Sequence, residues 1–360
     1  MKRLVILFVL NIAFLFVNAQ HFTVKNVPLS TINKHLNKMK YEREYNRYKR
    51  AAYPAVKYLP NNYNRSGKAD YTMNLQRALD RHQVVLLPNC PVQISDKGLR
   101  LKSNQVLLFQ PESKLILKPT ARGYYDMLQV ADVTNVKIFY ANLEGDRYGH
   151  LGKRGQWGFG ISIKSSSNIQ LYSPYLKYMW GDGIYIGQLN NVPSKNIEIQ
   201  NAVIDNVRRN GISITSAIGV DVIDTYIANT NGNSPESGLD IEPNSIHDEI
   251  KNINIINLTT YNNKWSGILL VFELFKSEQA KEVSINIDGH FDNGSRKGIS
   301  FHGYKNDRNT GNLIGQIKLN NVQYTNNQER YYFYNTNLSK LDLQTPEQEV
   351  KEKFDKMRKR

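Results

Sequence analysis

A short glycine-led pattern recurs through the second half of the chain and constrains its fold more than any other feature. Each copy reads Gly, aliphatic, any residue, apolar, and the six copies begin at Gly160, Gly183, Gly211, Gly238, Gly267 and Gly298. Successive glycines are 23, 28, 27, 29 and 31 residues apart. A repeat with a period in this range predicts a solenoid or a propeller, in which each repeat packs against its neighbours.

A second alternating strand follows each of these motifs. The strands lie at 169–171, 197–199, 220–222, 253–255, 283–285 and 317–319. No amphipathic stretch of ten or more residues separates the glycines, which excludes helical repeats, and no leucine ladder is present. A propeller is the alternative, but its blades usually need about 40 residues or more. We therefore expect an all-β solenoid, a single-stranded right-handed parallel β-helix with aliphatic side chains stacked inside its coils.

Asparagine is unusually abundant, with 41 residues in 360. Asn tolerates a left-handed backbone conformation, so we expect it at the turns, where its side chains can form a ladder along the stack. The single cysteine, Cys90, excludes an intramolecular disulfide framework and any multi-cysteine metal site.

The β-helix is expected to span 66–330, with earlier coils before the glycine motifs. Within it, 70–82 is typical of an amphipathic helix, capped by Asp70 or Thr72. A helix over the first coil would cover the open edge of the solenoid. The last segment, 331–360, is a charged tail that either forms a helix over the other end or frays.

The amino terminus has the layout of a secretory signal peptide. Lys2 and Arg3 precede an apolar run at 4–17, and Ala19 is a small residue at the position that signal peptidase reads. We expect removal of 1–19 by cleavage after Ala19, and a secreted or periplasmic protein. An uncleaved anchor is the alternative, although the run is short for a membrane span.

The formal net charge is +15, and the basic excess is concentrated in one segment. Residues 20–57 include nine basic and two acidic side chains, whereas 58–340 include 30 basic and 25 acidic ones. We treat 20–65 as a basic flank. Its residues 34–57 either bind an anionic envelope surface or glycan electrostatically, or form a helix that packs on the solenoid. Nucleic acid is not expected as the partner of an exported protein.

The start of the repeat region resembles the opening of the pectate-lyase-like right-handed β-helix superfamily. The residues that carry the likeness are Ala69-Asp70-Tyr71-Thr72, Leu75-Gln76-Arg77-Ala78-Leu79 and Val84-Val85-Leu86-Leu87-Pro88. The coils at 181–184, 208–213 and 238–242 are similar to those of bacterial secreted β-helix proteins that act on polysaccharides. The resemblance implies a long polysaccharide bound along the outer face of one sheet.

Motifs of particular activities in this superfamily are missing. The chain has Gly181-Asp182-Gly183 but lacks the Asn-Thr-Asp, paired-aspartate, Gly-His-Gly and Arg-Ile-Lys motifs of polygalacturonase-like hydrolases. It also lacks the Trp-Ile-Asp-His-type and Arg-Pro motifs of pectate lyases. The resemblance therefore implies an architecture and a class of partner, and the chemistry has to be argued from the residues.

Aligning the coils on their glycines places several acidic residues on one outer face. Asp240 and Glu242 share a strand, with Cα atoms about 6.5–7 Å apart, and Asp182 lies on the order of 10–15 Å from Asp240. We predict that these three residues are catalytic, because glycoside hydrolysis uses paired carboxylates, about 6.5–9.5 Å apart in inverting enzymes. Mutual repulsion, with Glu273 one coil away, should raise one pKa. A solvated polar face and a Ca²⁺ site are the alternatives.

Aromatic residues near this face are predicted to bind the substrate. Trp157, Trp180 and Trp265 each precede a repeating glycine by two or three residues. A Trp ring can stack on a sugar, although a ladder of tryptophans inside the core is an alternative. Tyr185 and His302 belong to the outward columns of the same alignment.

Basic residues supply the rest of the predicted binding set. Arg208 and Arg209 would bind the carboxylate or sulfate of an acidic sugar, unless they pair with Asp182 or Glu236 inside the protein. The further members of the set are Lys164 and Glu273.

The function favoured by these patterns is cleavage of a polysaccharide, expected to be acidic, by carboxylate-based hydrolysis without a cofactor. A lyase is the first alternative, in which an Arg, Lys164, Tyr185 or His302 removes a proton beside a uronate carboxyl group. Ca²⁺ would be a cofactor only in that case. A non-catalytic glycan-binding β-helix is the second alternative.

Overall fold

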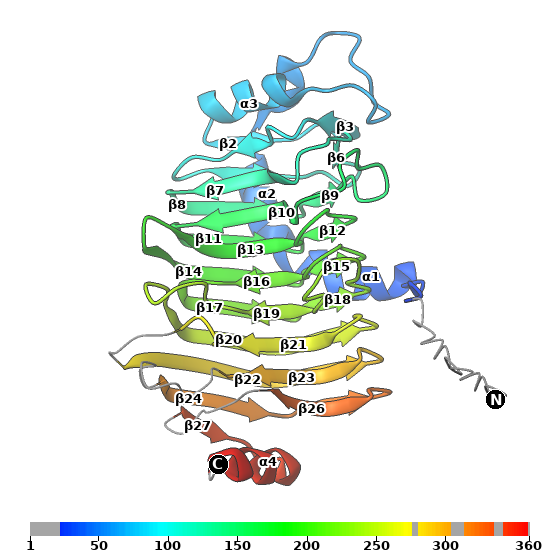
Figure 1. Cartoon of the computed structure of the whole chain (residues 1–360). Coiled ribbons are helices and arrows are strands. Elements are labelled where there is room, and N and C mark those ends of the chain that lie inside the picture. The colour runs from blue at the N-terminus through cyan, green and yellow to red at the C-terminus, as the bar shows by residue number, and fades with distance from the viewer. Residues whose placement is uncertain (1–21, 276–279, 304–312, 335–340, 359–360) are drawn as a thin grey trace, which may run out of the picture.

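The computed structural model describes residues 22–275, 280–303, 313–334 and 341–358. The predicted signal peptide at 1–19 lies outside these residues. The described chain coils into a parallel β-helix with an elongated stack of strands, as Figure 1 shows. None of its helices is long and apolar enough to cross a membrane.

Each coil contributes strands to three stacks, which we call the first, second and third sheets. The first sheet contains β4 (Leu99–Arg100), β7 (Tyr124–Ala131), β10 (Trp157–Lys164), β13 (Ile184–Leu189), β16 (Ile212–Ile214), β19 (Leu239–Ile241), β21 (Ser266–Val271), β23 (Lys297–His302) and β26 (Glu329–Tyr334). Pairing between neighbouring coils in this sheet is parallel.

The second sheet runs the whole length of the solenoid. It contains β1 (Tyr53–Pro54), β2 (Val84–Leu86), β5 (Val106–Leu108), β8 (Thr134–Phe139), β11 (Ser167–Tyr172), β14 (Val192–Gln200), β17 (Ala217–Ile223), β20 (Ile250–Tyr261), β22 (Lys281–Asn293), β24 (Leu313–Asn320) and β27 (Leu341–Gln344).

The third sheet is made of shorter strands. It contains β3 (Pro91–Ile94), β6 (Lys114–Leu117), β9 (Asn142–Glu144), β12 (Tyr175–Lys177), β15 (Val203–Asp205), β18 (Tyr226–Ala228), the ends of β20 and β22, and β25 (Gln323–Thr325).

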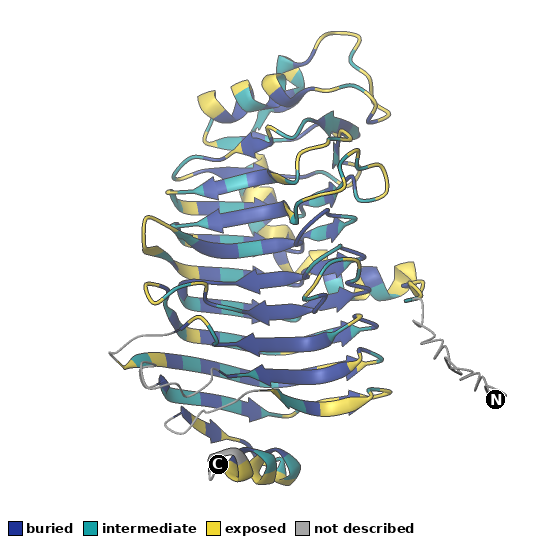
Figure 2. Cartoon of the chain, viewed as in Figure 1, coloured by how far each residue is buried: buried dark blue, intermediate teal, exposed yellow. Residues whose placement is uncertain are grey.

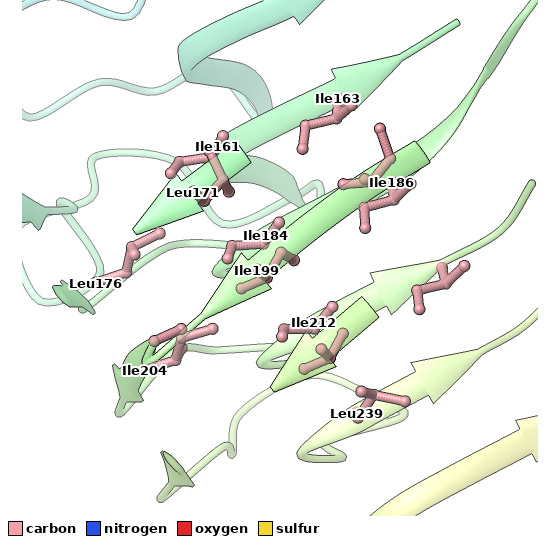
Figure 3. Close-up of a cluster of buried hydrophobic side chains, with 14 of the residues drawn as sticks. Ile161, Ile163, Leu171, Leu176, Ile184, Ile186, Ile199, Ile204, Ile212 and Leu239 are labelled. Carbon is pink, nitrogen blue, oxygen red and sulfur yellow. The ribbon is translucent and has the colours of Figure 1, made fainter. Parts of the chain in front are cut away.

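The aliphatic residues of the glycine motifs form the core, as predicted. The residues directly after the glycines pair in register through successive coils and are fully buried; they are Ile161, Ile184, Ile212, Leu239, Ile268 and Ile299. Figure 3 shows part of this stack between the sheets. Because side chains alternate along a strand, the residue after each of these points outward.

Asparagine ladders form at the turns, also as predicted. Asn104, Asn135, Asn168 and Asn196 all have positive φ and occupy the corner before the second sheet on successive coils. Asn168 Nδ2 donates to Asn135 Oδ1 over 3.1 Å, and Asn196 Nδ2 donates to Asn168 Oδ1 over the same distance. The left-handed backbone explains why Asn is used here, since other side chains strain in it.

Helices cover both ends of the solenoid (Figure 1). At one end, α3 (Thr72–Arg81) buries Leu75, Ala78 and Leu79, and Asp70 Oδ1 accepts a hydrogen bond from the Thr72 backbone N–H over 2.9 Å. At the other end, α4 (Gln348–Arg358) buries Val350 and Phe354. The β-helix extends past the predicted boundary at 330, because β26 and β27 continue its first and second sheets.

The basic flank packs on the solenoid, which is the second of the two alternatives for it. It forms α1 (Leu29–Leu36), η1 (Lys38–Tyr41), α2 (Glu42–Lys49) and η2 (Ala55–Tyr58). Ile32 and Leu36 pack on the third sheet, and Tyr41 and Tyr45 pack on the second. Most of the other residues of these helices are exposed, and Figure 2 shows buried and exposed stretches along α1. Asn side chains of the solenoid also donate hydrogen bonds to the flank. Asn262 donates to the Thr23 carbonyl, and Asn201 donates to the His35 carbonyl.

Candidate functional site on the first sheet

Strand pairing in the first sheet reproduces the predicted outward columns. Pairing joins one column residue to the next on each coil, in the order Ser162, Tyr185, Ser213, Asp240, Leu269 and Ser300. A second column two residues further on includes Lys164 opposite Gly187, and Val271 opposite His302. Glu242 directly follows β19 and belongs to this second column.

Asp240 and Glu242 form a coupled carboxyl pair. Asp240 is almost completely buried, whereas 29% of the Glu242 side chain is exposed. Burial, and then repulsion from Glu242, raises the pKa of Asp240 well above its ordinary value. Burial is also the largest cause of the raised pKa of Glu242, and Asp240 Oδ1 has no hydrogen-bond partner among the described residues. The pair therefore retains a proton to higher pH than two isolated carboxyl groups would.

The separation of about 6.5–9.5 Å between the two carboxyl groups of an inverting pair stays a prediction for Asp240 and Glu242. Burial, however, separates their roles. Asp240 is almost completely buried, so it cannot activate a water molecule against a bound substrate. If Glu242 transfers a proton to a substrate, the partner carboxylate has to be a different residue.

Arg209 links Asp182 to this pair. Its Nη1 donates to Asp182 Oδ2 over 2.8 Å, and its Nη2 lies 3.6 Å from Glu242 Oε2. Asp182 is fully buried, and burial raises its pKa against the opposing effect of Arg209. Burial alone would lower the pKa of Arg209, but Asp182, Asp240 and Glu242 together raise it. One cation thus faces three carboxyl groups. The net charge of the cluster is therefore negative, unless carboxyl groups in it stay protonated.

Asn210 is a member of the site that the sequence analysis missed. Its backbone N–H donates to Asp182 Oδ1 over 3.1 Å, and its Nδ2 donates to Asp240 Oδ2 over 2.8 Å. The Ser237 N–H donates to its Oδ1, which fixes the orientation of the amide. The sequence does place Asp182, Asn210 and Ser237 directly before the repeating glycines on successive coils, and this polar column could have identified Asn210.

Glu273 lies near the pair, as predicted. It is half-buried, and its charge contributes to the raised pKa of Glu242, of which burial is the largest cause. It follows β21, one coil beyond Glu242. Glu273 is therefore a partly accessible carboxylate close to the coupled carboxyl pair.

The tryptophans do not act together. Trp157 begins β10 and is 52% exposed beside Tyr124 of the neighbouring coil, so its ring is available to a ligand. Trp180 is 8% exposed, with the His150 ring stacked at 3.7 Å and the Arg208 guanidinium 3.8 Å from its centroid. Trp180 therefore cannot stack on a sugar, because its ring is already covered.

Trp265 is half-buried and lies farther along the sheet. Arg296 lies over its ring at 5.0 Å from the centroid, and Tyr332 meets it edge-on at 6.1 Å. It belongs to an aromatic group on the C-terminal coils, away from Trp157.

Both arginines of the predicted binding set are used inside the protein. Arg208 donates to the carbonyls of Gly155 and Trp180 and so holds the glycine-rich loop after β9. Arg209 pairs with Asp182, which is the intramolecular alternative considered above. Neither guanidinium is free to form a bidentate contact with the carboxylate of a sugar. Arg208 and Arg209 therefore no longer support an acidic substrate.

Lys164 and Tyr185 surround the approach to the acids. Lys164 Nζ lies 3.2 Å from Asp126 Oδ2 and 5.5 Å from the Tyr185 ring centroid. Tyr185 stacks on Phe159 at 4.7 Å, and its hydroxyl hydrogen-bonds to Thr215 Oγ1. Burial raises the pKa of Tyr185, so its hydroxyl stays protonated near neutral pH and is not available as a base.

His302 lies on the other side of the acids, four coils from Tyr185 in the sequence of pairings. Burial lowers its pKa to about 4, so the ring is neutral near pH 7. Its Nε2 is buried next to Tyr332 and Tyr334, without a hydrogen-bond partner among the described residues.

A groove of about 700 Å³ lies elsewhere, over the second sheet beside Tyr48. Its polar side chains satisfy one another, as in the 2.9 Å hydrogen bond from Gln170 to Glu198. We place the candidate site at the carboxyl cluster instead, because strongly perturbed pKa values gather at functional sites. No group of three or more His, Cys, Asp or Glu side chains arranged for a metal occurs in the described ranges.

Comparisons with known proteins agree on the fold. No protein-family model matches the chain. The chain is 28% identical over 162 residues to the SPbeta prophage-derived uncharacterized protein YorA of Bacillus subtilis. That match covers 40% of this chain and only 28% of the length of YorA.

Two solved structures are similar over most of the chain. Endo-xylogalacturonan hydrolase from Aspergillus tubingensis matches with a TM-score of 0.53, 12% identity and 74% coverage of each chain. Polygalacturonase from Erwinia carotovora matches with a TM-score of 0.51 and 16% identity, over 74% of this chain and 79% of that one. The predicted fold, a parallel β-helix, is confirmed.

Proposed function

We propose that the protein cleaves a polysaccharide bound along the outer face of the first sheet, by glycoside hydrolysis. The observation that carries the proposal is the coupled carboxyl pair of Asp240 and Glu242. Asn210 donates a hydrogen bond to Asp240, and Arg209 lies beside Glu242. Burying three carboxyl groups around one guanidinium costs stability, because desolvation disfavours their charged forms. A face that only bound a glycan would have no need of such a cluster.

Burial divides the work between the two acids. Asp240 is too deeply buried to touch a sugar, whereas Glu242 is partly exposed and can reach one. Glu242, protonated, gives its proton to the glycosidic oxygen as the bond from the anomeric carbon to that oxygen breaks. Asp240 is a positioning residue that shares its proton with Glu242 and keeps an acid available near neutral pH.

Hydrolysis also needs a carboxylate that activates water. Glu273 is the candidate, because it is accessible and lies near Glu242 without being hydrogen-bonded to it. It takes one proton from the water as the oxygen adds to the anomeric carbon, so that one water is consumed for each bond cleaved. Asp182 accepts a hydrogen bond from Arg209 and fixes that guanidinium against Glu242.

The fold comparisons support the class of substrate. Two proteins with this fold carry the names of hydrolases that act on polygalacturonan-type polymers. The exposed rings of Trp157 and Tyr124 lie on the coils before the acids, where they can carry sugar rings of a chain that runs along the sheet.

The test is cleavage of a panel of neutral and acidic polysaccharides by the wild type and two variants, Glu242→Gln and Asp240→Asn. We expect Glu242→Gln to lose about 10²–10⁴-fold in kcat, because general acid catalysis contributes that much. Asp240→Asn should lose less, and its pH profile should shift to lower pH. Glu198→Gln, a half-buried glutamate on the second sheet, is the matched control and should keep full activity.

Product analysis separates the alternatives. A hydrolase releases reducing ends only, whereas a lyase also releases an unsaturated uronate that absorbs in the ultraviolet. The unsaturated product would overturn the hydrolytic assignment. Polysaccharide binding without cleavage of any member of the panel would favour the glycan-binding alternative. Full cleavage by Glu242→Gln would refute the site.

A further inference from the structure

One face of α2 carries a row of arginines. Arg43, Arg47 and Arg50 are spaced by four and three residues, which places them on the same side of a helix. All three are exposed, and Lys40 lies beside them at the end of η1. With Tyr41 and Glu44 they line a shallow groove, so the four cations share one surface. We call Lys40, Arg43, Arg47 and Arg50 the arginine face.

Acidic neighbours neutralise only part of this charge. Lys40 Nζ donates to Asp224 Oδ2 over 3.4 Å. Among the described residues that line the groove, Glu44 is the one acid, and its Oε1 accepts a 2.7 Å hydrogen bond from Lys137 of the second sheet. Arg47 lies farther from Glu44, at 3.6 Å. Arg43 and Arg50 make no ion pair or side-chain hydrogen bond with any residue in the described part of the chain. Two guanidinium groups are thus left without a partner on a rigid surface.

The opposite face of α2 is what makes it rigid. Tyr45 is buried against Phe139 and Tyr140. Just before the helix, the Tyr41 hydroxyl donates to Gln200 Oε1 over 2.8 Å and also contacts Asn201 Oδ1. A helix of eight residues is marginal alone, so its position is set by this packing. The arginines therefore stand on a fixed support.

We propose that the arginine face binds an anionic polysaccharide. Guanidinium groups recognise carboxylates and sulfates in bidentate fashion, and steps of three and four helical residues separate them by about 4.5–6 Å along the helix axis. That separation suits a polymer with a charge on each sugar. A hydrated polymer fits the surface better than a membrane or a nucleic acid, because Tyr41 and Tyr45, which could insert into lipid or stack on bases, are buried.

The arginine face and the candidate active site belong to different sides of the solenoid. α2 packs on the second sheet, and Figure 1 places it behind the strands of the first sheet. One protein can therefore hold an anionic polymer at α2 while a chain segment occupies the first sheet. Such two-point attachment raises the effective concentration of the polymer at the second point. This inference does not depend on the proposed hydrolysis.

The experiment measures binding by the full-length mature chain to polygalacturonate and to heparin, in affinity electrophoresis at several salt concentrations. The variant Arg43→Gln/Arg47→Gln/Arg50→Gln removes three charges. The control Lys195→Gln/Lys351→Gln/Lys356→Gln removes three charges from exposed lysines scattered over the chain. Neutral dextran is the control polymer. Thermal unfolding midpoints of both variants verify that the fold is intact.

We expect the arginine variant to bind the anionic polymers at least tenfold more weakly and with a shallower salt dependence, while the lysine variant stays close to the wild type. Equal weakening in both variants would mean that net charge alone causes binding, and would refute the site. Equal binding to dextran would refute electrostatic recognition. Tighter arginine-dependent binding to phosphatidylglycerol vesicles or to DNA than to either polysaccharide would overturn the choice of partner.

Discussion

The same coils build two contrasting outer surfaces, one on the first sheet and one on the second. On the second sheet, the outward residues Phe139 and Tyr172 are buried under the tyrosines of the flank. On the first sheet, Asp240, Ser213 and Ser300 are buried outward among other polar side chains. Burial of aromatic surface stabilises the fold, whereas burial of a carboxyl group costs free energy unless it is compensated. The contrast assigns stability to the second surface, and it is consistent with the chemistry that we propose for the first.

The largest test of this contrast compares an aromatic residue from each surface. Phe139→Ala removes a fully buried ring that contacts Tyr172 at 4.9 Å, and we expect it to lower the free energy of unfolding by about 3–5 kcal/mol. Trp157→Ala, on the first sheet, removes an exposed ring and should cost less than about 0.5 kcal/mol. Urea unfolding measures both. Similar losses for the two variants would contradict the assignment of the surfaces.

A smaller effect is expected at the corner between the two surfaces. Asn168 has a φ of 56° and both donates and accepts in the asparagine ladder. Asn168→Ala loses both hydrogen bonds and strains the backbone, so it should cost about 1–2 kcal/mol. Asn168→Gly loses the same bonds without that strain and should cost less. If alanine is tolerated as well as glycine at this corner, the left-handed backbone does not explain the ladder.

The smallest expected effect is a change in how stability depends on pH. Because the pKa of Asp240 is raised in the folded state, the folded protein retains a proton that the unfolded chain releases above about pH 4. The free energy of unfolding therefore falls as pH rises from there toward the folded pKa. Asp240→Asn should flatten this fall and gain stability at pH 8 relative to pH 5. Asp132→Asn, an exposed turn residue, is the control, and an identical slope in both variants would argue against a proton on Asp240.

Much of the fold could be predicted because the repeat fixes its own register. Once Gly183, Gly211 and Gly238 are aligned, the outward neighbours Tyr185, Ser213 and Asp240 follow from strand alternation, and the pairing confirms them. The positions of Asp240 and Glu242 on one outer face were predictable for the same reason. Whether they are catalytic remains a prediction.

The details of the site depended on contacts that a repeat does not encode. Trp180 looked equivalent to Trp157 in the alignment, but the loop after β9 folds back and places His150 on its ring. The sequence left open whether Arg209 binds a ligand or pairs with Asp182, because the two residues are 27 positions apart and only their contact decides it. Burial also mattered, since Cα spacing does not show that Asp240 is buried while Glu242 is partly exposed. The periodicity of the repeat therefore predicts positions along the strands, but neither loop contacts nor side-chain burial.

The flank runs backward along the solenoid, and this direction sets an order of assembly. Its first described residues bind near Asn262, 239 positions later in the chain, and its last strand, β1, pairs with β2 at the opposite end. During synthesis the flank is made first, yet the coil that receives its first described residues is not complete until Asn262 has been made. Its tyrosines and arginines are therefore exposed until the coils beneath them form, and the fully docked flank shows that the coils from β2 to β20 have been completed in register.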